Sequence, residues 1–130
     1  LAVCEGKGRC SMCHSGFNFT ENGVHNLGLK ETGEPDLGRY NIVRIERNKG
    51  GFKTPTLRDV ALTAPYMRTG IYKTLEEVID HYNRGGDVKA HLSPDIVPLN
   101  LTAQEKADLL AFMKSLTGPQ MQVTIPILPQ

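Results

Sequence analysis

Tryptophan is absent from this sequence, and cysteines and long apolar runs are scarce. Three cysteines in 130 residues are too few for a disulfide scaffold of the kind that stabilises small secreted domains. No apolar run approaches the ~18 residues that a membrane-spanning helix needs, so no membrane association is expected. Fifteen Lys and Arg residues against fourteen Asp and Glu residues give a net charge of +1, a balance that gives no indication of a nucleic-acid or membrane-surface partner.

The length of the chain suits one domain with one core. Hydrophobic residues make up 39% of the chain, which is somewhat low for a core of that size. A large embedded cofactor would supply the missing apolar bulk.

The segment "CSMCH" contains a pair of cysteines, Cys10 and Cys13, followed directly by His14. Cys-x-x-Cys-His is the attachment motif of c-type haem. A thioredoxin-like site would need a βαβ context, and a zinc site would need a second pair of ligands; neither follows in the sequence. We therefore expect one covalently attached haem c, with thioether bonds to both cysteines and His14 as the proximal iron ligand. In bacteria such attachment occurs outside the cytoplasm, which predicts a periplasmic location. Cys4 is expected to be a small apolar residue packed near the haem.

Two segments have the features of amphipathic helices. Residues 102–116 begin with Thr102 and carry Glu105 three positions later, and residues 74–83 repeat this pattern with Thr74 and Glu77. Both pairs are capping boxes. Apolar residues follow at helical spacing in each segment: Leu109, Leu110, Met113 and Leu116 in the first, and Leu75, Val78, Ile79 and Tyr82 in the second. A short, weaker helix is expected before Cys10.

The rest of the chain is predicted to lack long regular elements. Residues 15–73 are dense in Gly, Pro, Asn and Thr, and loops of such length are unusual unless they wrap an object such as a haem. The tail, residues 119–130, is apolar and interrupted by three prolines, so it should not form a helix. We expect it to cover a surface of a partner domain or chain.

The residue pattern leaves several roles open. Tyr82, on the apolar face of the 74–83 helix, is either a distal iron ligand or a core tyrosine, and Met67 in a loop is the other candidate ligand. His81, one residue from Tyr82, is expected to face solvent. Arg58 could bind a haem propionate bidentately, and His25 could reach the haem edge or a propionate.

The order of these elements resembles a class I cytochrome c domain, which implies a mainly α fold with long irregular loops around one covalently attached haem. The stretches "CSMCHSGFNFTENGVHNLGL", "DLGRY", "FKTPTLRDVALTAPYMRTG", "TLEEVIDHYNRGG" and "LTAQEKADLLAFMKSLTG" resemble, in order, the C-terminal haem domain of the bacterial di-haem cytochrome c peroxidase and MauG family. The haem domain would span residues 1–118, and the tail 119–130 would pack on a partner. With a single attachment motif, the chain would hold only the half of such an enzyme that receives and passes electrons, and not the haem that reacts with peroxide.

The resemblance also implies roles for individual residues. It places the distal ligand at Tyr82, as in MauG-like members, whereas other members have Met there, and it makes Met67 a non-ligating position. Arg68 stands where peroxidase members commonly carry His, which favours the MauG-like branch. The backbone carbonyls of Thr63 and Pro65 correspond to ligands of a calcium ion between the two haems, whose remaining protein ligand would lie in the other domain.

The sequence thus predicts the electron-transfer haem domain of a di-haem peroxidase-like or MauG-like oxidoreductase that uses hydrogen peroxide. Its partners would be a second haem domain or chain, a small redox protein as electron partner, and a second copy if the enzyme is a homodimer. The alternative is a free-standing monohaem electron-carrier cytochrome c without catalysis.

Overall fold

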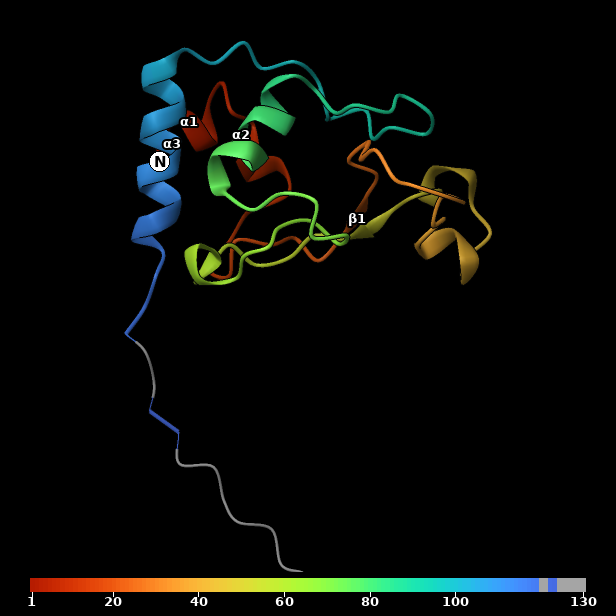
Figure 1. Cartoon of the computed structure of the whole chain (residues 1–130), viewed down its shortest axis with the longest axis horizontal. Coiled ribbons are helices and arrows are strands. Elements are labelled where there is room, and N and C mark those ends of the chain that lie inside the picture. Colours follow the sequence, from red (N-terminus) through yellow and green to blue (C-terminus); the bar gives the residue numbers. More distant parts are fainter. Residues whose placement is uncertain (120–121, 124–130) are drawn as a thin grey trace, which may run out of the picture.

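The computed structural model describes residues 1–119 and 122–123. Within these residues it has few helices and little strand (Figure 1). The α-helices are α1 (Ala2–Glu5), α2 (Leu75–Asn83) and α3 (Ala103–Ser115). Single turns of 3₁₀ helix occur at η1 (Cys10–Met12), η2 (Arg39–Asn41), η3 (Glu46–Asn48) and η4 (Val60–Leu62). The two-residue strands β1 (Val24–His25) and β2 (Phe52–Lys53) pair antiparallel. None of the helices in this part of the chain has the length and apolar character needed to cross a membrane.

Both predicted capping boxes are present, and they fix where α2 and α3 begin. The Thr74 hydroxyl accepts a hydrogen bond from the Glu77 amide at 3.2 Å, and the Glu77 carboxylate accepts one from the Thr74 amide at 3.0 Å. Thr102 and Glu105 repeat this exchange at 3.2 and 2.7 Å. The predicted helices 74–83 and 102–116 are therefore confirmed, with the threonines as N-caps.

Removing the N-cap side chain of α3 should destabilise the domain without replacing a residue of its hydrophobic core. We expect Thr102→Ala to lower the free energy of unfolding by about 1 kcal/mol, because the Glu105 amide loses its acceptor. Thr102→Ser, which keeps a hydroxyl oxygen at the cap, should lower it by much less. Denaturant unfolding followed by circular dichroism measures both values. Equal losses in the two variants would contradict the capping argument.

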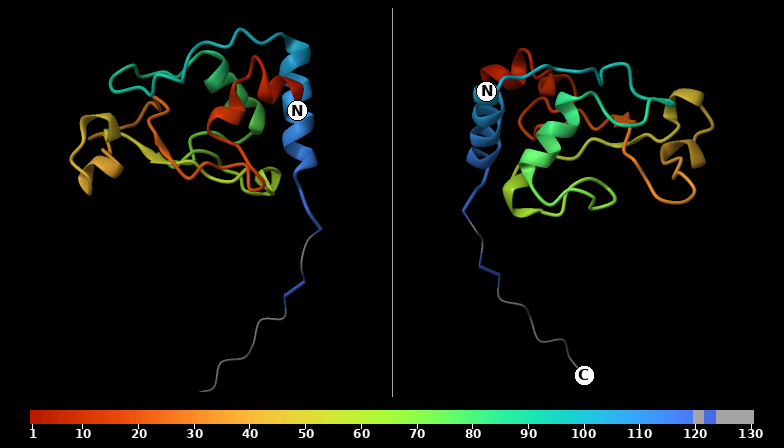
Figure 2. Two further views of the ribbon diagram at one scale, coloured as in Figure 1. Left: turned by 180° about the vertical axis from the view of Figure 1, so that it is seen from behind. Right: turned by 45° about the horizontal axis from the view of Figure 1, so that its top comes forward.

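The three α-helices pack together and form the core at one end of the molecule. α3 contacts both α1 and α2, and in all views it stands upright with these two beside it (Figures 1 and 2). The core cluster consists of Cys4, Leu75, Ile79, Leu101, Leu109 and Met113. The apolar stripes read from the sequence supply four of these six residues, so the helical spacing identified the faces that pack.

The long segment between the attachment motif and α2 is irregular, as predicted. Two single 3₁₀ turns, η2 and η3, lie within this segment. These turns lie at the end of the molecule away from α3 in every view (Figure 2). β1 and β2 flank the loop that contains these turns, and they pair through Val24–Lys53 and His25–Phe52. The strands thereby bring the loops back to the region beside η1.

Candidate haem-binding cavity

An apolar cavity of about 470 Å³ lies between η1, α2, α3 and the loops. Its size falls within the range of small-molecule and cofactor sites. Its apolar walls include Leu27, Leu29, Phe52, Leu57, Val60, Leu75, Ile79, Val97, Leu99, Leu109, Phe112 and Met113. The loops of residues 15–73 supply much of this wall, which explains why so long an irregular segment can be ordered here.

His14 lines the cavity with one ring nitrogen already engaged. Its Nδ1 lies 3.0 Å from the Phe19 carbonyl oxygen. A carbonyl only accepts, so Nδ1 carries the hydrogen and Nε2 keeps a free lone pair. Burial lowers the pKa of His14. The neutral imidazole with Nε2 free is the form that binds a metal ion.

Cys10 and Cys13 also line the cavity, one turn apart on and just after η1. The pKa of Cys10 is raised by its hydrogen bond with Cys4 and by burial, and burial raises the pKa of Cys13. Both sulfurs are therefore present as thiols. Cys4 is 2% exposed in α1 and packs at the cavity, in agreement with its expected role as a small apolar residue.

Both candidates for the distal ligand reach the same cavity. Tyr82 lines the cavity from the last turn of α2. Met67 lines it from a loop, where its φ is +65°. Burial raises the pKa of Tyr82, and nearby Cys10 and Cys13 raise it further. The phenol is thus neutral in the protein alone, and a ferric ion would have to displace its proton. The geometry brings Tyr82, Met67 and His14 to one space.

Arg58 does not line the cavity. Its Nε and Nη2 donate to the Phe17 carbonyl at 3.0 and 2.6 Å, and the guanidinium lies over the rings of Phe17 and Phe19. The propionate role expected for Arg58 therefore gains no support from its position. The basic residues along the cavity wall are Arg9, Lys53 and Arg68. The family resemblance singled out Arg68 for another reason, and nothing in the sequence marked Arg9 or Lys53, because parts of the chain far apart in the sequence come together at this wall.

His25, the candidate for contact with the haem edge or a propionate, has two polar neighbours. It lines the cavity, and its Nε2 is 3.5 Å from Cys13 Sγ and 3.4 Å from a Glu21 carboxylate oxygen. Cys13, Glu21 and His25 could together hold a metal ion, but only while Cys13 is not bonded to haem. Thr63 and Pro65 lie on the cavity wall as well.

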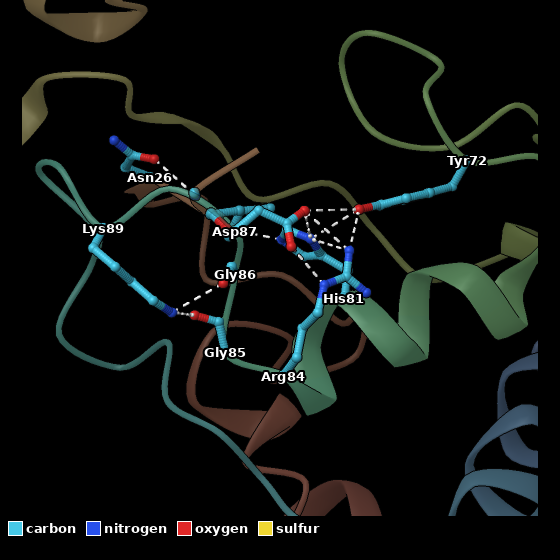
Figure 3. A network of polar contacts seen from close by, with 10 residues as sticks. Asn26, Tyr72, His81, Arg84, Gly85, Gly86, Asp87 and Lys89 are labelled. Atoms are coloured by element: carbon cyan, nitrogen blue, oxygen red, sulfur yellow. Dashed lines mark hydrogen bonds and ion pairs between the residues drawn. The ribbon is translucent and has the colours of Figure 1, made fainter. Parts of the chain in front are cut away.

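The expected orientation of His81 is wrong. His81 is fully buried, and its Nε2 lies 2.8 Å from the Leu27 carbonyl oxygen. Its Nδ1 lies 3.0 Å from the Tyr72 hydroxyl (Figure 3). The helical wheel predicted exposure because it treats the face away from the apolar stripe as open. The loop around Leu27 covers that face, and its backbone provides a polar partner inside the protein.

The residues that line the cavity fit a c-type haem. They supply two thiols, an oriented neutral imidazole, and a phenol and a thioether as further ligands, all within an apolar enclosure. An apolar enclosure suits a porphyrin ring, and imidazole, phenol and thioether are all known iron ligands in haem proteins.

Comparisons with known proteins agree with this assignment. No protein-family model matches the chain. Methylamine utilization protein MauG of Methylorubrum extorquens is 36% identical over 129 residues, which cover 99% of this chain and 36% of that protein. Cytochrome-c peroxidase IdrP2 of Denitromonas iodatirespirans is 34% identical over 154 residues, covering 98% of this chain and 41% of that one.

A solved structure gives the same result. The crystal structure of a MauG-like protein associated with microbial copper homeostasis superposes with a TM-score of 0.82 at 37% identity, covering 91% of this chain and 45% of that chain. The chain thus spans less than half the length of each of these relatives. With a cavity lined by Cys10, Cys13, His14 and Tyr82, and with homologues of this kind along nearly its whole length, the chain belongs to the family of MauG and the cytochrome c peroxidases.

Proposed function

We propose that this chain is the electron-transferring haem domain, of class I cytochrome c type, of a periplasmic di-haem oxidoreductase that uses hydrogen peroxide. One haem c would be attached through Cys10 and Cys13, with His14 as its proximal ligand and Tyr82 as its distal ligand. The observation that carries the proposal is that all four side chains line one apolar cavity. Sequence likeness to MauG and to cytochrome c peroxidases over nearly the whole chain supports the same conclusion.

The protein's residues would perform two tasks around the cofactor. The haem supplies reversible one-electron chemistry when bound. His14 is held by the Phe19 carbonyl, and this bond fixes the direction of Nε2 and makes the imidazole a stronger donor. Tyr82 would hold the cofactor together with His14 and exclude small ligands. A domain with both side chains in this role would pass electrons without binding peroxide itself.

The remaining parts of the enzyme follow from this role. Peroxide would react at a second haem domain, in the same chain or in a separate one, and the relatives are long enough to contain such a domain. A small redox protein would exchange electrons with the enzyme, which could act as a homodimer. Calcium would bind at the domain boundary through the carbonyls of Thr63 and Pro65. The tail 119–130, most of which lies outside the described residues, would pack on the second domain.

The native protein itself provides the test. Its intact mass and its haem-to-protein ratio should show two haems on a protein of at least about twice the 14.3 kDa of this chain, or two haems shared with a tightly associated second chain. This chain expressed alone with covalent haem should not turn over peroxide. A native protein of this mass with one haem, and with Met67 as its ligand, would instead be a free-standing electron carrier.

A further inference from the structure

The two residues beside Tyr82 are each bound to a different part of the cavity wall. Successive residues of an α-helix are separated by about 100° around its axis, so His81 and Asn83 lie on opposite sides of Tyr82. We propose that His81 and Asn83 are positioning residues that hold the last turn of α2 so that Tyr82 is directed at the haem iron. This inference rests on the proposed role of Tyr82.

His81 joins α2 to the loop that forms one wall of the cavity. Its ring is fully buried, and Nε2 donates to the Leu27 carbonyl at 2.8 Å. The Leu27 side chain lines the cavity. Because Nε2 carries the hydrogen, Nδ1 is an acceptor and receives the Tyr72 hydroxyl at 3.0 Å. Both ring nitrogens are therefore satisfied, and the ring has one favourable orientation.

An ion pair supports the outer side of this ring (Figure 3). The guanidinium of Arg84 donates to Asp87 through two nitrogens at 2.6 and 3.0 Å, and its Nη2 donates to the Tyr72 oxygen at 2.7 Å. The Arg84 guanidinium lowers the pKa of Asp87 to about 2, so this carboxylate is charged at neutral pH. The Tyr72 hydroxyl has two acceptors for its own hydrogen, His81 Nδ1 at 3.0 Å and Asp87 Oδ2 at 3.4 Å, and the shorter contact is the one to His81.

The turn that ends α2 is joined to the same loop by its backbone. The amides of Asp87 and Val88 both donate to the Gly28 carbonyl at 2.9 Å. Gly86 has a φ of +75°, and a Cβ there would lie 2.8 Å from the Leu27 oxygen, so this close approach requires glycine. The last turn of the helix and residues 27–28 thus form one rigid unit.

Asn83 holds the opposite side of the turn. Its Oδ1 accepts the Leu101 amide at 2.7 Å, and its carbonyl accepts the Leu99 amide at 3.0 Å. Leu99 and Leu101 also line the cavity. A roll of α2 about its axis in either direction would break the bonds of His81 or those of Asn83. The bonds on both sides thus restrain the backbone of Tyr82, which lies between them and lines the cavity.

The test uses the haem-loaded chain with two disruptive and two conservative variants. His81→Phe removes both ring hydrogen bonds, and Asn83→Ala removes the acceptor of the Leu101 amide. His81→Gln keeps a donor and an acceptor, and Asn83→Asp keeps the acceptor. The spin state of the ferric haem and the apparent affinity for cyanide report whether the sixth position is filled. Thr102→Ala serves as the stability control, because Thr102 does not line the cavity and its side chain bonds to Glu105 of α3, not to α2.

We expect His81→Phe and Asn83→Ala each to give a fraction of high-spin iron and to raise the apparent cyanide affinity about tenfold, which corresponds to a tenfold larger open fraction. His81→Gln, Asn83→Asp and Thr102→Ala should stay close to the parent. If His81→Phe does not fold, Tyr72→Phe removes the donor to Nδ1 at a less buried position and should shift the spin state in the same direction.

Two different failures can be told apart. If Tyr82→Phe leaves the ferric spectrum unchanged, Tyr82 is not the ligand, and the inference is overturned together with that part of the proposed function. If Tyr82→Phe opens the sixth position while His81→Phe and Asn83→Ala change it no more than Thr102→Ala does, Tyr82 is the ligand but its neighbours do not position it. Disruption by the conservative variants to the same extent would also overturn the inference.

Discussion

Tyr82→Phe is expected to turn a six-coordinate haem into one with an open sixth position. The ferric protein should become high-spin and should bind cyanide and peroxide, which the parent would bind weakly. Tyr82 lines the cavity together with His14, and no other side chain of α2 that lines it, namely Leu75, Val78 or Ile79, carries a ligating atom. Phenylalanine keeps the ring and its packing, so the change isolates the loss of the oxygen.

The reduction potential should respond to the same substitution. A phenolate is anionic and hard, and it stabilises ferric iron more than ferrous iron, whereas a thioether favours the ferrous state. The parent should therefore have a low potential, and Tyr82→Phe should raise it. Electronic absorption, electron paramagnetic resonance and a potentiometric titration measure these effects on one preparation.

Met67→Leu is the matched control, because Met67 also lines the cavity and leucine retains its bulk. It should leave the spin state and the potential nearly unchanged. The opposite result would be a weak near-infrared band of an iron–sulfur bond in the parent that Met67→Leu abolishes. That outcome would make Met67 the ligand. It would favour a free-standing electron-carrier cytochrome over the haem domain of a di-haem peroxidase-like enzyme.

Replacing both attachment cysteines should abolish the covalent attachment of the haem. In Cys10→Ala/Cys13→Ala the haem should become extractable by acidic acetone, while either single variant should retain it through one thioether bond. The double variant should also unfold at a midpoint that depends on haem concentration, since a dissociable ligand stabilises the folded state only by mass action. The parent, with the haem bonded to the chain, should show no such dependence.

Cys4→Ala provides the control for this experiment. Cys4 is buried beside Cys10 and lines the same cavity, but it lies outside the attachment motif. Its replacement should leave the haem covalently bound. Covalent haem that survives in the double variant would show that Cys10 and Cys13 are not the attachment sites.

Short-range patterns carried most of what could be predicted. The capping boxes of Thr74 and Thr102 each join residues three positions apart, so the starts of α2 and α3 can be read locally. The apolar spacing identified the helix faces that pack in the core. Cys10, Cys13 and His14 are close together in the sequence, and all three line the cavity. The same reasoning placed the candidate ligand Tyr82 on the inner face of α2.

Only the tertiary structure decided the positions of the polar side chains. His81 was expected at the surface, but it binds a carbonyl 54 residues away, and Arg58 binds one 41 residues away instead of lining the cavity. A helical wheel or a motif describes one element in isolation, and it contains nothing about which loop will cover that element. A polar side chain goes where a complementary backbone group lies, and that group is brought into place by the folding of the whole chain. The sequence by itself therefore determined the helices, the attachment motif and the family, whereas the arrangement that holds Tyr82 at the cavity became visible only in three dimensions.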